Sequence, residues 1–153
     1  MSKKQFNLAR TALITFFQEM DEATADVQAK YFNNTIRWHI GHVLVTTEKL
    51  FFRYPKKSEN IPVHYSDLFS GGTKPSDWDQ EIPSLEELTK YLVEQQERIN
   101  SFDDLFWKSN VTFKVPFGSV ETFSDLLIML GHHESEHLGK MKAMLQVVTN
   151  ADA

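Results

Sequence analysis

Four long amphipathic segments constrain the fold of this chain more than any other feature. They run from about Lys4 to Met20, from about Thr35 to Arg53, from Ser84 onward, and from about Thr122 to Val148. In each of them apolar residues recur every three or four positions, which places them on one face of an α-helix. Such a face must be buried against other elements. The chain is therefore predicted to be all-α, a four-helix bundle.

Capping residues predict where these helices begin and end. Asn34 can cap the second helix, and Pro55 ends it. The third and fourth helices each begin with a capping-box pattern, Ser84–Glu87 and Thr122–Asp125. The apolar stripe of the third helix is predicted to continue through Phe106. Its members are Leu85, Leu88, Leu92, Ile99, Phe102 and Phe106.

The connections between the predicted helices differ in length. The second and third helices are separated by a long, proline-rich segment that also contains Gly71 and Gly72. A connection of this length can cross the bundle from end to end, so that helices two and three run parallel. Residues His64–Phe69 can form one helical turn within it. Apolar residues alternate over Val111–Phe117, which predicts an extended piece packed on the bundle and stopped by Gly118.

Composition narrows the class of protein. The length predicts a single domain spanning residues 1–153, and a hydrophobic content of 41% argues against disorder. The net charge is −5 and basic residues never form a long run, so no nucleic-acid surface is expected. No apolar run is long enough to span a bilayer, and the N-terminus lacks the apolar core of a signal peptide. We therefore expect a cytoplasmic protein without a membrane partner.

Two histidine clusters stand out. His133 and His137 lie four residues apart in the fourth helix, about 40° apart on the helical wheel and on its apolar stripe. Buried imidazoles need partners, and one metal ion would satisfy both. The alternative is a pair of core histidines that bond other side chains, and both interpretations stay open. Residue His132 points about 100° away from His133, and His64 lies in the long connection.

The second cluster, His39 and His42, lies on a polar strip of the second helix. Thr46, Lys49 and Arg53 share this strip. The strip is bordered by apolar residues, so it can line a ligand cleft. The helical wheel alone favours the ordinary interpretation, a solvated face.

Residues His133–His137 also match two known metal motifs. In H-E-x-x-H, two histidines bind zinc and the glutamate is the general base, which would be Glu134 here. A zincin needs a third ligand, and the only acid downstream is Asp152 near the end of the chain. The E-x-x-H element of di-iron bundles needs a second copy, which the sequence lacks. Both interpretations are therefore disfavoured.

Three segments carry a resemblance to a known family: Thr35–His42, then Pro116–Gly118 followed by Thr122–Leu130, and the closing histidine pair. Together they resemble the DinB/YfiT-like superfamily of small metal-binding four-helix proteins. The first is similar to the family's second helix, and the second to its approach to the last helix. His133-x-x-x-His137-x-Gly139 is similar to the family's closing H-x-x-x-H-x-G-Q. The order of elements fits over nearly the whole chain. The final glutamine of the motif is replaced by Lys140.

The resemblance implies a divalent metal held by His42, His133 and His137, whereas His39 does not match a ligand position. Zn²⁺ and Ni²⁺ are the first candidates, with Mn²⁺ or Fe²⁺ next. Family members include bacterial transferases and isomerases that use a low-molecular-weight thiol such as bacillithiol. This chain has no cysteine, so a thiol would have to come from a cosubstrate. Lys140 could disfavour metal, orient an anionic substrate, or extend to solvent.

The expected function follows from this resemblance. The first hypothesis is a metal-dependent enzyme that transfers a small thiol to an electrophile, with metal-assisted hydrolysis next. The alternative is a non-catalytic stress-response or binding protein in which the metal only braces the bundle. A further alternative has no metal at all. A small-molecule substrate is expected in the first case, and a homodimer is left open.

Overall fold

The computed structural model describes residues 2–115 and 119–150. Within these ranges the regular structure is helical, and the only β-type pairing is an isolated bridge between Asn110 and Thr122. The long helices are α1 (Ser2–Phe17), α3 (Ile36–Phe52), α5 (Leu85–Asn100) and α7 (Phe123–Thr149). The short ones are α2 (Glu22–Ala25), α4 (Tyr65–Phe69), α6 (Asp104–Lys108) and the 3-10 turn η1 (Pro75–Asp77). The all-α prediction is confirmed.

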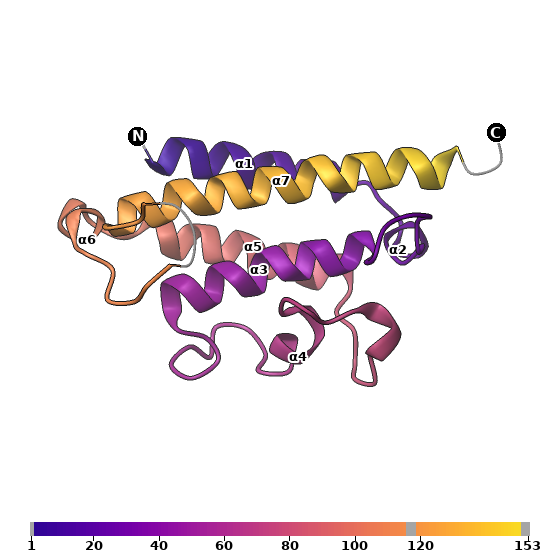
Figure 1. Ribbon diagram of the computed structural model, residues 1–153, viewed down its shortest axis with the longest axis horizontal. Coiled ribbons are helices and arrows are strands. Elements are labelled where there is room, and N and C mark those ends of the chain that lie inside the picture. Colours follow the sequence, from indigo (N-terminus) through magenta and orange to yellow (C-terminus); the bar gives the residue numbers. More distant parts are fainter. Residues whose placement is uncertain (1, 116–118, 151–153) are drawn as a thin grey trace.

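The long helices lie side by side (Figure 1). Helix α1 packs along α7 and also contacts α5, while α3 contacts both α5 and α7. In Figure 1, α1 and α7 run in one direction and α3 and α5 run in the other. No helix in the described part of the chain is both long and apolar enough to cross a membrane.

Two helix starts agree with the sequence and one does not. Helix α7 has the predicted capping box between Thr122 and Asp125. At α5, the hydroxyl of Ser84 accepts a hydrogen bond from the backbone N–H of Glu87. Helix α3 is capped by Thr35, whose hydroxyl accepts from the N–H of Trp38, so the assignment of the cap to Asn34 was wrong. Both residues are good caps, and the helix begins at the later one.

Two predicted helix ends are also wrong. Helix α1 stops at Phe17, and Met20 closes a turn by donating its N–H to the carbonyl of Phe17 at 3.1 Å. Helix α5 stops at Asn100, and Phe106 belongs to the separate helix α6. The carboxylate of Asp103 accepts from the N–H of Phe106 at 2.9 Å, which starts this new helix.

The residues that the structure describes between α6 and α7, 109–115 and 119–122, form no strand. The N–H of Val111 donates to the carbonyl of Glu121 at 2.9 Å. The side chains of Val111, Phe113 and Val115 pack on the core, as predicted for an extended piece. The predicted stop at Gly118 lies outside the described residues. The short turn expected at His64–Phe69 is present as α4, whose cap position is His64.

A buried ion pair joins α1 to α7. The guanidinium of Arg10 donates to both carboxylate oxygens of Glu134, at 2.8 and 2.7 Å, and both side chains are completely buried. Arg10 also donates to the carbonyl of Leu92 at 2.8 Å and to Gln95 Oε1 at 3.0 Å, both on α5. Three of the long helices are therefore fixed to each other by one network.

A second buried carboxylate holds the segment after α3 in place. Glu48 accepts hydrogen bonds from Ser58 Oγ at 2.7 Å, Asn60 Nδ2 at 2.9 Å and Gln95 Nε2 at 2.6 Å. Arg98, on α5, contributes an ion pair at 3.0 Å. These contacts keep the beginning of the long connection against α3 and α5.

A close approach at Gly41 positions α4. The ring of Phe69 lies so near the Gly41 backbone that a Cβ added there would come within 2.3–2.5 Å of three ring atoms. Phe69 is completely buried, so its ring has no room to move away. Only glycine therefore allows this contact, which brings the backbone of residue 69 next to the side chain of His42.

Candidate metal centre

Three histidines meet between α3 and α7. His42 comes from α3, and His133 and His137 come from successive turns of α7. One ring nitrogen of each lies within 4.8 Å of the corresponding nitrogens of the other two. The Nε2 atoms of His133 and His137 are 3.1 Å apart. The structure thus brings together the three residues that the family resemblance singled out.

The ring of His42 is held from two sides. Its Nδ1 lies 2.7 Å from the backbone carbonyl of Phe69, so Nδ1 carries the proton and donates it. The indole of Trp38 stacks on the ring, with centroids 4.6 Å apart and planes 11° from parallel. Trp38 is itself held by a 2.9 Å hydrogen bond from Nε1 to the hydroxyl of Thr73. The Nε2 of His42 therefore keeps its lone pair, as a metal ligand requires.

His137 is oriented by a fourth histidine. Its Nδ1 lies 2.8 Å from Nδ1 of His39, which is only 3% exposed. When His137 donates its Nδ1 proton to His39, the lone pair of His137 Nε2 is free to face the cluster. His39 therefore contacts the side of His137 that faces away from the cluster, a role that was not predicted from the sequence. The spacing of His39 and His42, three residues apart on one helix, is the sequence signal that could have suggested it.

The geometry of the rings fits a shared ion. Two nitrogens bound to one ion at about 2.0–2.1 Å are separated by about 2.9–3.4 Å for tetrahedral or octahedral angles. The 3.1 Å between the Nε2 atoms of His133 and His137 falls in this range. The closeness of one nitrogen from each of the three rings, together with this separation, means that the residues present fit a divalent ion.

Burial keeps these imidazoles neutral. Desolvation lowers the pKa of His39 and of His133 to about 4 and that of His137 to about 2, and neighbouring histidines add to the effect in each case. Burial also lowers the pKa of His42. At neutral pH all four rings are therefore uncharged, which is the form that binds metal.

The depressed pKa values predict that the metal-free protein loses stability in acid. Between pH 6.5 and 4 the unfolded chain binds protons that the folded chain excludes, so folding becomes less favourable as the pH falls. Stability is complete above pH 6.5. At pH 5 the burial of His39, His133 and His137 costs on the order of 2 kcal/mol for each ring. Urea unfolding of chelator-treated protein at pH 7.5, 6 and 5 measures the loss.

A pair of variants tests the origin of this pH dependence. The substitution His39→Leu removes one buried imidazole and should make the change in unfolding free energy between pH 7.5 and 5 smaller. The substitution His64→Leu changes a histidine that lies outside the cluster and is the matched control. Equal pH dependence in all three proteins would show that the buried cluster does not cause it.

The remaining predicted residues lie outside the cluster. His132 is exposed, with Nε2 3.3 Å from a carboxylate oxygen of Glu136. His64 occupies the cap position of α4 and contacts the ring of Tyr65 edge to face. The interpretation of the α3 polar strip as a solvated face was wrong for His39 and His42. Both residues face α7. The prediction failed because the helical wheel of one helix does not show which neighbouring helix covers it.

The structure also removes the zincin interpretation. Glu134, which would be the general base, is completely buried and is paired with Arg10 of α1. A carboxylate held by two charge-assisted hydrogen bonds in the core cannot receive a proton from a ligand at the cluster. The match of residues 133–137 to H-E-x-x-H is therefore a coincidence of spacing.

The cluster reaches the surface beside Lys140. Glu136, His137 and Lys140 line an open hollow of about 290 Å3. Lys140 is exposed, and its positive charge helps to lower the pKa of His137 and His39. A small molecule can therefore approach His137 from solvent, past one cation and one carboxylate.

These features define a class: an all-helical protein with a three-histidine cluster, able to hold a metal ion, between two of its long helices. The family is also shown by sequence. The profile of the DinB superfamily matches residues 5–141, and the chain belongs to this superfamily. A search of curated proteins found no match. The resemblance inferred from the motifs is thus confirmed.

Proposed function

We propose that this chain is a divalent-metal-dependent enzyme built on a four-helix bundle of α1, α3, α5 and α7, with residues 53–84 as its crossover. The observation that carries the proposal is the set of three neutral histidines beside an open hollow. Three protein ligands leave coordination positions free, which distinguishes catalytic from structural zinc sites. His42, His133 and His137 would hold the ion.

The ligand type supports a choice of metal. Imidazole nitrogens suit Zn²⁺ and Ni²⁺, with Fe²⁺ or Mn²⁺ as weaker candidates. A divalent ion in this position would lower the pKa of a bound thiol or water. The favoured reaction is transfer of a low-molecular-weight thiol to an electrophile: the thiol loses its proton, a carbon–sulfur bond forms, and the bond from that carbon to the leaving group of the electrophile breaks. Since the chain has no cysteine, this thiol is a cosubstrate.

Residues around the hollow have separate roles in this proposal. The ammonium of Lys140 attracts an anionic cosubstrate toward His137. The carboxylate of Glu136, which is exposed on the same hollow, can receive the thiol proton and release it to solvent. His39 keeps His137 in the orientation that presents Nε2. Glu134 takes no part, because it is paired with Arg10.

The test is an activity assay with matched variants. We expect protein loaded with Zn²⁺ or Ni²⁺ to accelerate conjugation of bacillithiol to a small electrophile, measured as loss of free thiol. The free thiol has a pKa of about 8.5, so the gain should be largest near pH 7. His137→Ala should abolish the acceleration. Lys140→Gln should change the KM for the thiol more than it changes metal affinity, and His132→Ala should change neither.

Two other outcomes would replace this reaction. Turnover of ester or amide substrates without any thiol effect would identify metal-assisted hydrolysis. Absence of turnover, together with a large gain in thermal stability on adding metal, would favour a non-catalytic role. The ligands come from both α3 and α7, so an ion would brace these two helices. The catalytic proposal places the protein in a reducing bacterial cytoplasm with a small-molecule substrate.

A further inference from the structure

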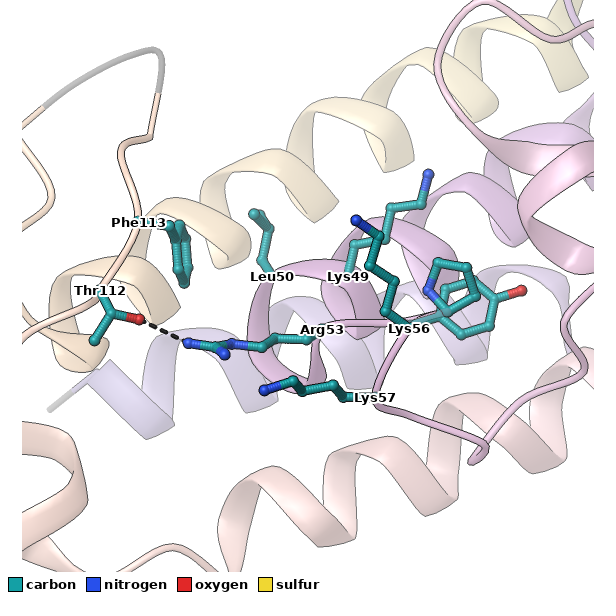
Figure 2. A pocket seen from close by; sticks show the side chains of 9 residues that line it. Lys49, Leu50, Arg53, Lys56, Lys57, Thr112 and Phe113 are labelled. Atoms are coloured by element: carbon teal, nitrogen blue, oxygen red, sulfur yellow. Dashed lines mark hydrogen bonds between the residues drawn. The ribbon is translucent and has the colours of Figure 1, made fainter.

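A pocket at the end of α3 carries a concentration of positive charge that the proposed reaction does not use. It has a volume of about 410 Å3, within the range of small-molecule sites. Its basic residues are Lys49, Arg53, Lys56 and Lys57, and no acidic residue lines it (Figure 2). Within the described residues, none of the four forms an ion pair with a carboxylate. This is unusual in a chain whose net charge is −5.

The basic groups are held by neutral partners. Lys49 Nζ donates to the hydroxyl of Ser70 at 2.6 Å, and Arg53 Nη2 donates to the hydroxyl of Thr112 at 2.9 Å. Figure 2 shows the long side chain of Arg53 reaching toward Thr112. Burial lowers the pKa of Lys49, since its ammonium has lost part of its hydration. An anion in the pocket would compensate these charges, which neutral hydroxyls cannot do.

The end of α3 does not by itself explain the cluster. Cations are favoured near the C-terminus of a helix, which accounts for Lys49 and Arg53. Lys56 and Lys57 lie beyond the helix, in the turn that follows its end. One of the last carbonyls of α3 is occupied, because the N–H of Arg53 donates to the carbonyl of Lys49 at 3.2 Å.

The other lining residues are apolar. Leu50, Tyr54, Pro55 and Phe113 complete the pocket. A simple inorganic ion would leave these side chains uncovered. A ligand with an apolar body and a multiply charged end would contact both kinds of surface, with the body against Leu50 and Phe113 and the charge near the lysines.

We propose that this pocket binds a small organic phosphate monoester, with the apolar group against Phe113 and the phosphate near Lys56, Lys57 and Arg53. Phosphate binds lysine ammonium groups, and arginine binds it through two parallel hydrogen bonds. The binding itself does not depend on a metal. His42 and Lys49 lie on one face of α3, about 10 Å apart along the helix. The pocket could therefore anchor a substrate of the histidine cluster, and this part of the proposal rests on the proposed function.

The test measures binding of 2-naphthyl phosphate by calorimetry to metal-free protein at low salt. We expect binding that weakens as salt is added, because exposed charges are screened. The double variant Lys56→Gln/Lys57→Gln should weaken binding about tenfold, since an exposed ion pair contributes up to about a factor of five. The control Lys74→Gln/Lys142→Gln removes the same charge elsewhere and should leave the affinity within about twofold.

Two further measurements separate the parts of the proposal. Phe113→Ala should weaken binding of 2-naphthyl phosphate but not of inorganic phosphate, and uncharged 2-naphthol should bind poorly. Binding that survives in His137→Ala shows that the pocket acts independently of the histidine cluster. The proposal is overturned if the two double variants bind alike. It is also overturned if His137→Ala abolishes binding while Lys56→Gln/Lys57→Gln does not.

Discussion

Replacing His137 with alanine is expected to weaken Zn²⁺ binding by at least about a hundredfold. A structural zinc site with four ligands binds with about 10–16 kcal/mol, so one ligand accounts for roughly 3 kcal/mol. His137 also lies between the other rings, with Nδ1 toward His39 and Nε2 toward His133. Its loss therefore removes a ligand and disturbs a neighbour. Competition titration with a chromophoric chelator measures the affinity.

The other histidines provide graded controls. His42→Ala and His133→Ala should cause losses of the same order, because each supplies one nitrogen of the cluster. His39→Ala should cost about 10–100-fold, as expected for a residue that orients a ligand without binding the ion. His64→Ala and His132→Ala should have no effect. A loss with His132→Ala as large as that with His137→Ala would disprove the ligand assignment.

The second large effect concerns the buried ion pair. Changing Glu134 to methionine should destabilise the fold by about 3–5 kcal/mol, because the guanidinium of Arg10 would remain buried without its carboxylate. Arg10→Met should cost a similar amount. The double variant Arg10→Met/Glu134→Met should be more stable than either single variant, since no uncompensated charge remains. Urea unfolding gives the four free energies needed for the cycle.

Glu136→Gln is the matched control for this cycle. Glu136 lies two residues further along α7 and pairs with His132, but both side chains are about two-thirds exposed. Its removal should change the unfolding free energy by less than about 1 kcal/mol. An equally small effect of Glu134→Met would show that the network joining α1, α5 and α7 does not stabilise the fold to the extent that its burial implies.

The sequence predicted the helices well because helix formation depends on local spacing and capping. The stripes and the Thr122–Asp125 capping box located α7 to within a few residues. The error at the end of α5 has a physical cause. Phe102 and Phe106 stack with centroids 3.8 Å apart and keep the apolar pattern going, although the helix stops and restarts at Asp103. Hydrophobic spacing alone does not record such a break.

The candidate metal centre could be predicted from the sequence only in part, for a different reason. The family resemblance pointed to His42, whereas the helical wheel placed it on a solvated face, because a wheel carries no information about the neighbouring helix. The role of His39 depends on a contact with His137 across 98 positions of sequence. The pairing of Arg10 with Glu134 spans 124 positions. Contacts of this kind arise from the packing of α1, α3 and α7 and leave no local pattern.

The position of α4 has a thermodynamic consequence. Phe69 accepts the hydrogen bond that orients His42, and the next residue, Ser70, accepts the hydrogen bond of Lys49 in the basic pocket. Any ligand that shifts Phe69 and Ser70 changes the free energy of binding both at the histidine cluster and in the basic pocket. Such coupling is reciprocal, so an anion that strengthens metal binding by some factor has its own affinity raised by the same factor. Two small ligands would then report on each other through a single short helix.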